Sequence, residues 1–283
     1  MSAGNTNSGY AQTLEAILSE FQLIKLRLDA AGVELPPSCR FSLFEREIHN
    51  VIIVRDKNLP PSDVNWPVLI EGFRDTAELK VITSSTQVLT AGIPILRQIF
   101  SGTRLPSEDA NSIARDKQFE LYLASVLERT GFGVALEEPD IRFTYNSEVY
   151  SLAAKRIRSP QQIRKRYREA IRQIKRYPHP GFIGISLDPL VRGIGDMNII
   201  AGSPDAMDDA GNTILTKFLQ NDLGPQVAHH KDDQIIGLIA SLVMPSLLPK
   251  RIGLGSVSVL RAIYFQTQGM DICKMIGSNT FDE

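Results

Sequence analysis

The stretch that decides the fold is 139–157, which reads PDIRFTYNSEVYSLAAKRI. Residues 139–145 alternate in part between apolar and polar side chains, Asn146-Ser147 supplies turn chemistry, and residues 149–157 form a mostly apolar return. Such a pattern is typical of a β-hairpin. Asp140 opens the first strand and Lys155 closes the second, so the sequence predicts an acid and a lysine on neighbouring strands.

The segments around this hairpin predict an α/β core. A helix is expected over 108–129, where apolar residues recur on one stripe and Gly131 follows as a stop signal. Ser159-Pro160 begins a second helix, because Pro suits the first helical position, and Pro178 ends it. The short apolar run 182–187 is bounded by Gly181 and Pro189, as a buried strand is. The predicted order is helix, strand, strand, helix, strand.

The remaining segments give a coarser prediction. Residues 10–31 and 69–83 are expected to be helical, and residues 1–105 are taken as a mainly helical N-terminal domain that selects a partner or substrate. Leu105-Pro106-Ser107 marks the boundary, and 106–283 is the second domain. Within it we expect strands over 197–201 and 257–265, helices over 212–223 and 232–243, and a loosely ordered tail after Gly269.

Composition excludes several classes of protein. The chain has 283 residues, 43% hydrophobic and 22% charged, as a soluble globular protein does. Its apolar runs fall short of the roughly 18 residues of a membrane span, so no membrane partner is expected. Met1 to Ser8 lacks the features of a secretory leader. The 2 cysteines, Cys39 and Cys273, form no metal spacing or disulfide framework, which favours the cytoplasm.

The net charge of −1 conceals a local excess of positive charge. Between Lys155 and Arg176, Glu169 is the one acid among ten basic residues (155, 156, 158, 164, 165, 166, 168, 172, 175 and 176). One such run on a nearly neutral protein favours a polyanion contact, although a solvated helix face explains it equally well.

Taken together, these features resemble the PD-(D/E)XK nuclease superfamily. The resemblance rests on Pro139-Asp140, Lys155, the helical Glu120, and Gln173 and Tyr177 four residues apart, as in RecB-like members. It covers about 107–188 and implies a restriction-endonuclease-like fold, with a mixed sheet flanked by helices. It implies a metal-dependent deoxyribonuclease in which Lys155, Asp140 and Glu120 are catalytic. Asp140 and Glu120 would then bind Mg²⁺ or Mn²⁺, the hard cations that suit oxygen ligands.

The chain departs from this family at Ala153, where an acid is expected two residues before the lysine. A methyl group cannot bind metal, so the activity is expected to be absent or weak. Three explanations compete: an inactivated variant, a naturally degenerate member, or replacement of the acid by Glu137, Glu138 or Glu148.

The basic segment supplies the expected nucleic-acid contacts. Arginine and lysine side chains there would contact phosphates rather than read bases, and Tyr167 is assigned to the apolar stripe of the helix. The candidate nucleic-acid-binding residues are Arg156, Arg158, Arg164, Lys165, Arg168, Arg172, Gln173 and Tyr177. DNA is the expected partner, and RNA stays open.

Two rival functions remain at this level. One is a catalytically inactive nucleic-acid-binding or assembly module; the other is a small-molecule enzyme built on residues 190–265. A metal site at His229-His230 is disfavoured because adjacent side chains diverge. Apolar residues at 14, 17, 21, 24 and 28 predict a bundled helix or a dimer seam, so a protein partner or a homo-oligomer is expected through the N-terminal domain. By analogy, a lone nuclease with such an appendage fits phage defence or restriction.

Overall fold

A seven-stranded mixed sheet organises the part of the chain that the structure, a computed structural model, describes: residues 3–58, 64–109, 111–191, 204–227, 233–248, 253–266 and 269–278. The strand order is β1-β7-β6-β5-β4-β3-β2. Neighbours among β4, β5 and β6 are parallel, and the other neighbours are antiparallel. The strands are β1 (Ala3–Gln12), β2 (Gly133–Ala135), β3 (Ile141–Tyr145), β4 (Glu148–Arg156), β5 (Gly181–Ser186), β6 (Ile235–Leu248) and β7 (Gly253–Tyr264).

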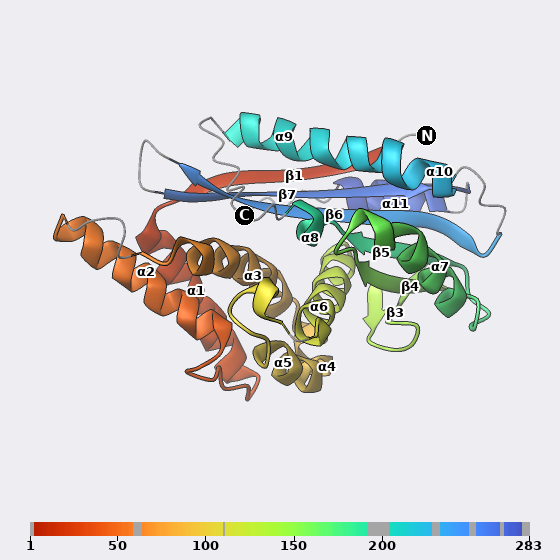
Figure 1. Cartoon of the computed structure of the whole chain (residues 1–283). Helices are drawn as coiled ribbons and strands as arrows, with labels where there is room; N and C mark the ends of the chain where they lie inside the picture. The colour runs from red at the N-terminus through yellow and green to blue at the C-terminus, as the bar shows by residue number, and fades with distance from the viewer. Residues whose placement is uncertain are drawn as a thin grey trace.

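Helices cover both faces of this sheet. In Figure 1, α9 lies above the strands, and α3 and α6 lie below them. The helical segments are α1 (Leu14–Ala30), α2 (Arg40–Asp56), α3 (Trp66–Ser84), α4 (Thr86–Ala91), α5 (Ile93–Phe100), η2 (Pro106–Glu108), α6 (Ile113–Arg129), η3 (Pro160–Gln162), α7 (Ile163–Ile174), α8 (Asp188–Val191), α9 (Pro204–Lys217), η4 (Phe218–Leu223), α10 (Gly224–Val227) and α11 (Met270–Ser278). The prediction of an α/β protein with a mixed sheet flanked by helices is therefore confirmed.

The hairpin of β3 and β4 forms where the sequence predicts it. Asn146 and Ser147 both have positive φ, 48° and 66°, which is the backbone that a two-residue hairpin turn requires. The register pairs Ile141 with Leu152 and Tyr145 with Glu148. Strand β4 continues past the start of β3, so the last residues of β4 border Asp140 at an open edge.

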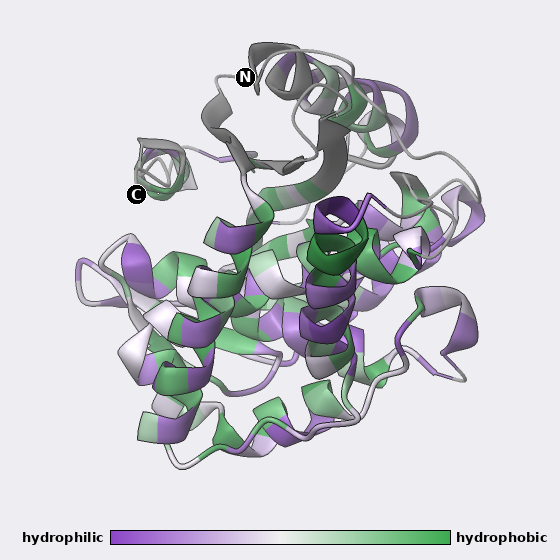
Figure 2. Ribbon diagram, turned by 90° about the vertical axis from the view of Figure 1, so that its left-hand side faces the viewer, coloured by the Kyte–Doolittle hydropathy of each residue, from purple (hydrophilic) through white to green (hydrophobic). Residues whose placement is uncertain are grey.

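Alternation along the strands divides the core between the two faces. Leu152 and Ala154 belong to the cluster that includes α6 and α11, and Phe143 stacks on Tyr150 there at 5.3 Å between ring centroids. Ala153 and Ile183 belong to the cluster that includes α7. Figure 2 shows apolar and polar residues alternating along the surrounding helices, as amphipathic helices require.

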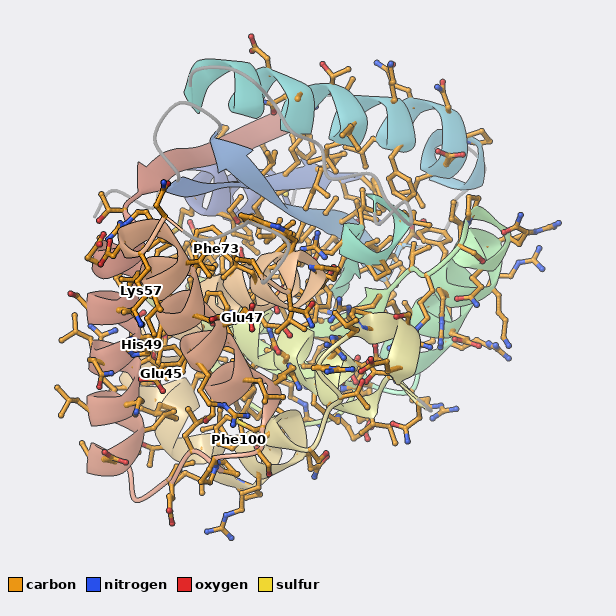
Figure 3. The ribbon with its side chains drawn as sticks, turned by 60° about the vertical axis from the view of Figure 1, so that its left-hand side comes forward. Glu45, Glu47, His49, Lys57, Phe73 and Phe100 are labelled. Atoms are coloured by element: carbon orange, nitrogen blue, oxygen red, sulfur yellow. The ribbon has the colours of Figure 1, made fainter. Side chains whose placement is uncertain are left out.

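Two carboxylates of α2, Glu45 and Glu47, which Figure 3 labels, accept hydrogen bonds from α1 and from the start of α3. Glu45 accepts hydrogen bonds from Gln22 at 2.8 Å and from Lys25 at 3.2 Å, both on α1. Glu47 accepts one from the backbone of Asn65, which caps α3. The N-terminal helices also join the main core, since Phe21 and Phe41 share a cluster with residues of α6 and the sheet.

Several sequence expectations require correction. Residues 3–12 form an edge strand paired with β7, so the helix expected from residue 10 begins at Leu14, and part of the N-terminal segment joins the sheet. The helix expected over 232–243 is wrong, because β6 occupies this region between β5 and β7. Residues 270–278 of the tail form α11, and the strand expected over 197–201 lies outside the described residues.

The boundary at residue 105 stays a prediction, and the core is continuous across it. Among the described helices, none has the length and apolar character needed to cross a membrane.

Candidate active site

Asp140 and Lys155 meet at the open edge of the β3–β4 hairpin. The Lys155 Nζ lies 3.2 Å from Asp140 Oδ2, and the Ala154 backbone N–H donates to the same oxygen at 2.8 Å. Lys155 Nζ also donates to the Ala154 carbonyl oxygen at 2.7 Å. The expected convergence of Asp140 and Lys155 is confirmed, whereas their catalytic roles stay a prediction.

Helix α6 brings a second acid to this edge. Glu120 is largely buried and accepts a hydrogen bond from Lys117 at 2.6 Å, one turn earlier on the helix. Burial and the nearby charge of Asp140 raise the pKa of Glu120 to about 7, against the opposing effect of Lys117 and Lys155. Two acids and two lysines, one of each from α6 and from the hairpin, therefore share one electrostatic environment.

The ionisation of this group follows from burial. Burial raises the pKa of Asp140, while the charge of Lys155 and the backbone N–H of Ala154 act to lower it. Burial tends to lower the pKa of Lys117, but its hydrogen bond to Glu120 and the nearby charges of Glu120, Asp140 and Glu138 together raise the pKa. Near pH 7, Glu120 therefore populates both protonation states, a property of groups that transfer protons.

The oxygen atoms near this edge are of the kind that a hard divalent cation prefers. Asp140 and Glu120 supply carboxylates, and the Ala154 carbonyl oxygen faces the same ammonium group as Asp140 Oδ2. Mg²⁺ prefers such oxygen ligands and keeps several waters, so this small donor set suits it. The described residues contain no group of three or more histidines, cysteines and acids placed to hold a metal ion.

Ala153 lies beside this site and is completely buried in the cluster that α7 covers. By strand alternation its side chain shares a face with Lys155. Two of the three proposed substitute acids already have other partners. Glu148, at the far end of β4, accepts a hydrogen bond from the Tyr150 hydroxyl, and Glu137 pairs with Arg142 at 2.9 Å. The third acid, Glu138, helps to raise the pKa of Lys117 through its charge, so it is the candidate that interacts electrostatically with the site.

Helix α7 presents most of the basic segment to solvent. It buries Ile163, Tyr167, Ala170 and Ile174, which confirms that Tyr167 belongs to the core. The exposed basic residues of the segment are Arg158, Arg164, Lys165, Arg168, Arg172, Lys175 and Arg176. Arg164, Arg168 and Arg172 repeat every four residues and so share one face of the helix.

The expectation that Arg156 contacts phosphate does not fit the structure. Its side chain lies on the opposite face of β4 from Lys155 and is 6% exposed. Its guanidinium donates to the Arg115 carbonyl oxygen of α6 at 2.9 Å. Arg156 is thus an internal residue that connects β4 with α6.

Gln173 lies in the last turn of α7, whereas Tyr177 lies after the helix has ended at Ile174, so the two residues do not share the helix that the sequence predicts. The Arg142 guanidinium, on β3, stands over the Tyr177 ring at 5.2 Å from its centroid. The Gln173 Oε1 is buried and has no hydrogen-bond partner among the described residues. No described contact joins Gln173 or Tyr177 to Asp140 or Lys155, so their role in nucleic-acid binding stays a prediction.

A buried charged network behind the site was not anticipated from the sequence. Arg40 pairs with Asp75 at 2.7 Å, and Gln118 donates to Glu78 at 2.5 Å. Burial, followed by the nearby charge of Asp188, raises the pKa of Glu78 to about 8. In the sequence these charged residues look like exposed positions of ordinary surface helices. The signal that could have indicated their burial is that α3 and α6 carry apolar residues on several sides.

The His229-His230 pair lies outside the described residues. Compared with known proteins, the chain matches no protein-family model, no curated protein and no solved structure.

Proposed function

We propose that the protein is a metal-dependent phosphodiester hydrolase that acts on DNA, with its centre at Asp140, Lys155 and Glu120. The observation that carries the proposal is the contact between Lys155 and Asp140 at an open strand edge, with a buried acid of pKa about 7 beside them. A restriction-endonuclease-like fold and an N-terminal domain of residues 1–105 are parts of this proposal.

Each residue has a role that its surroundings allow. Asp140, Glu120 and the Ala154 carbonyl oxygen would hold Mg²⁺ or Mn²⁺, which supplies charge neutralisation at the phosphate and acidifies a bound water. Lys155 carries a positive charge that can bind a non-bridging phosphate oxygen. Without bound metal the pKa of Glu120 is about 7, and a bound cation would favour the charged carboxylate that the metal needs as a ligand.

The exposed arginines of α7 would bind the nucleic-acid backbone. Phosphate contacts of this kind give affinity without sequence preference, so the proposal covers DNA generally and leaves RNA open. Phage defence or restriction is the proposed setting, in the cytoplasm, with a protein partner or a second copy bound through the N-terminal helices. The apolar stripe of α1 is buried within the fold rather than forming a dimer seam, so such a contact would use other residues.

One observation favours a second candidate, a nucleic-acid-binding module without catalysis. Ala153 is buried among apolar residues, and the described acids at the site are two rather than three. A protein that keeps the basic face of α7 but holds metal weakly would bind DNA and cleave it slowly or not at all.

A cleavage assay separates these candidates. End-labelled duplex DNA, single-stranded DNA and RNA are incubated with the protein in Mg²⁺ and in Mn²⁺. The nuclease proposal predicts metal-dependent cleavage that is lost in Lys155→Met and in Asp140→Asn.

Lys80→Met is the matched control, because Lys80 is also a partly buried lysine that pairs with a carboxylate, Glu20 at 2.6 Å. Cleavage that persists in Lys155→Met at the wild-type rate contradicts the proposal. If all variants bind DNA and none cleaves it even at high protein concentration, the second candidate, a binding module without catalysis, is supported.

A further inference from the structure

Arg156 joins the two elements on which the proposed catalytic residues stand. It follows Lys155 on β4 but points to the opposite face, where it hydrogen-bonds the Arg115 carbonyl oxygen at 2.9 Å. Arg115 lies in the first turn of α6, ahead of Lys117 and Glu120 on the same helix. One guanidinium therefore connects the strand of Lys155 with the helix of Glu120.

The charge of this guanidinium interacts with buried charged residues of α3 and α2. Glu78 of α3 interacts with the charge of Arg156 and accepts a hydrogen bond from Gln118 of α6. The charge of Asp188, which follows β5, helps to raise the pKa of Glu78. Asp188 itself accepts hydrogen bonds from the Ser186 hydroxyl at 3.1 Å and from the Val243 N–H at 2.7 Å.

Other charges of the network lie close by. The charge of Asp75 on α3 also helps to raise the pKa of Glu78. The charges of Arg115 and Arg156 help to lower the pKa of Arg40 on α2. Arg115 pairs with Asp75 at 3.5 Å and also with Asp109. The hydrogen bond to the Arg115 carbonyl oxygen therefore holds the Arg156 guanidinium, and Glu78 supplies a buried negative charge that interacts with it.

We propose that Arg156 is a positioning residue that sets how α6 lies against β4 and thereby brings Glu120 to Asp140 and Lys155. The catalytic role of this positioning rests on the proposed function, whereas the effect of Arg156 on the position of Glu120 can be tested without it. A displacement of about 1 Å is enough to impair a site of this kind, so the effect is expected on metal affinity before it is seen on folding.

The decisive experiment is a double-mutant cycle read by Mn²⁺ binding, with calorimetry of the metal alone. Arg156→Met is expected to weaken Mn²⁺ binding by about tenfold in the wild-type background. In the Glu120→Gln background the same change is expected to have little further effect, because its action passes through Glu120. Equal losses in both backgrounds would show that Arg156 does not act through Glu120 and would overturn the proposal.

Arg74→Met is the matched control. Arg74 is also buried and also donates to a carbonyl oxygen of the sheet, Val243 O at 3.0 Å, but it has no described hydrogen bond to α6. Its loss is expected to leave Mn²⁺ affinity unchanged. If Arg156→Met does not fold, the cycle is repeated with Arg156→Lys, which keeps the charge and loses the planar guanidinium.

Metal-free hydrogen exchange separates failure of this inference from failure of the proposed function. If the wild-type protein binds no Mn²⁺, the proposed function fails, and the exchange of backbone amides decides the inference. Arg156 variants are expected to accelerate exchange in α6 relative to Arg74→Met. Exchange rates in α6 that match those of the control would overturn the positioning role.

Discussion

Replacing Glu120 with glutamine should change how the stability of the protein depends on pH. In the folded protein, burial raises the pKa of Glu120 from the ordinary 4.5 to about 7. A carboxyl with a raised folded pKa stabilises the folded state below the unfolded pKa, and this contribution is lost as pH rises through the folded pKa. The wild-type protein should therefore lose stability at this residue between about pH 4.5 and 7.

The magnitude follows from the size of the pKa change. One unit corresponds to about 1.4 kcal/mol, so the rise to about 7 corresponds to roughly 3 kcal/mol over the whole interval. Glutamine has nearly the same shape and no charge to bury. Relative to wild type, Glu120→Gln should thus gain roughly 3 kcal/mol of unfolding free energy as pH rises from below 4.5 to above 7.

Urea unfolding in EDTA at several pH values measures this difference directly. Glu78, whose pKa is raised to about 8, titrates in both proteins and largely cancels in the comparison. The control is Glu169→Gln, since Glu169 also pairs with a basic residue three positions earlier, Arg166 at 3.0 Å, but is 25% exposed. Parallel pH profiles for wild type and Glu120→Gln would refute the assignment of a buried, shared site.

Further predictions concern binding and the fold. Arg164→Ala, Arg168→Ala and Arg172→Ala combined should weaken DNA binding whatever the sequence and reduce the slope of log K against log salt by about 2 to 3, at ~0.7–0.9 per phosphate contact. Anisotropy titrations at several salt concentrations measure this slope, and an unchanged slope would leave the α7 face as a solvated surface. Gly237→Ala should destabilise the protein by roughly 1–3 kcal/mol. An added Cβ there would lie 2.4 Å from Phe182 of β5 and 2.7 Å from the Ile263 carbonyl oxygen of β7. Denaturant unfolding checks this value, and unchanged stability would contradict the place of β6 between β5 and β7.

The hairpin and its flanking helices could be predicted because their signals are local. Alternation, the Asn146-Ser147 turn and the capping residues specify elements without reference to the rest of the chain. The sequence of β6 gives no strand signal because residues 235–243 are apolar except for Ser241, and a strand buried on both faces has no period of two. Strand β1 carries few residues that favour strands, and its pairing depends on β7, more than two hundred residues later.

The candidate site could be predicted only in part. The contact of Asp140 with Lys155 follows from strand register, since pairing Ile141 with Leu152 places Asp140 at the end of β4. The burial of Arg156 follows from the same alternation along β4. Because Arg156 belongs to a run of basic residues, the sequence favours an exposed position for it instead. Glu78 and Asp75 lie on α3, and their burial depends on packing between α3, α6 and the sheet that no local pattern contains.

The most direct test of the central claim restores an acid at residue 153. Ala153 shares a face of β4 with Lys155 and lies next to Asp140, but it is buried in the apolar cluster under α7, so a glutamate there must reach the Asp140 edge to act as the third carboxylate. Plasmid cleavage in Mg²⁺ is compared among wild type, Ala153→Glu, and Ala153→Glu combined with Asp140→Asn, after circular dichroism establishes that each is folded. The account predicts faster cleavage by Ala153→Glu and its loss when Asp140 is also replaced. A folded Ala153→Glu protein that cleaves no faster than wild type, or a rate that is independent of Asp140, would contradict the account.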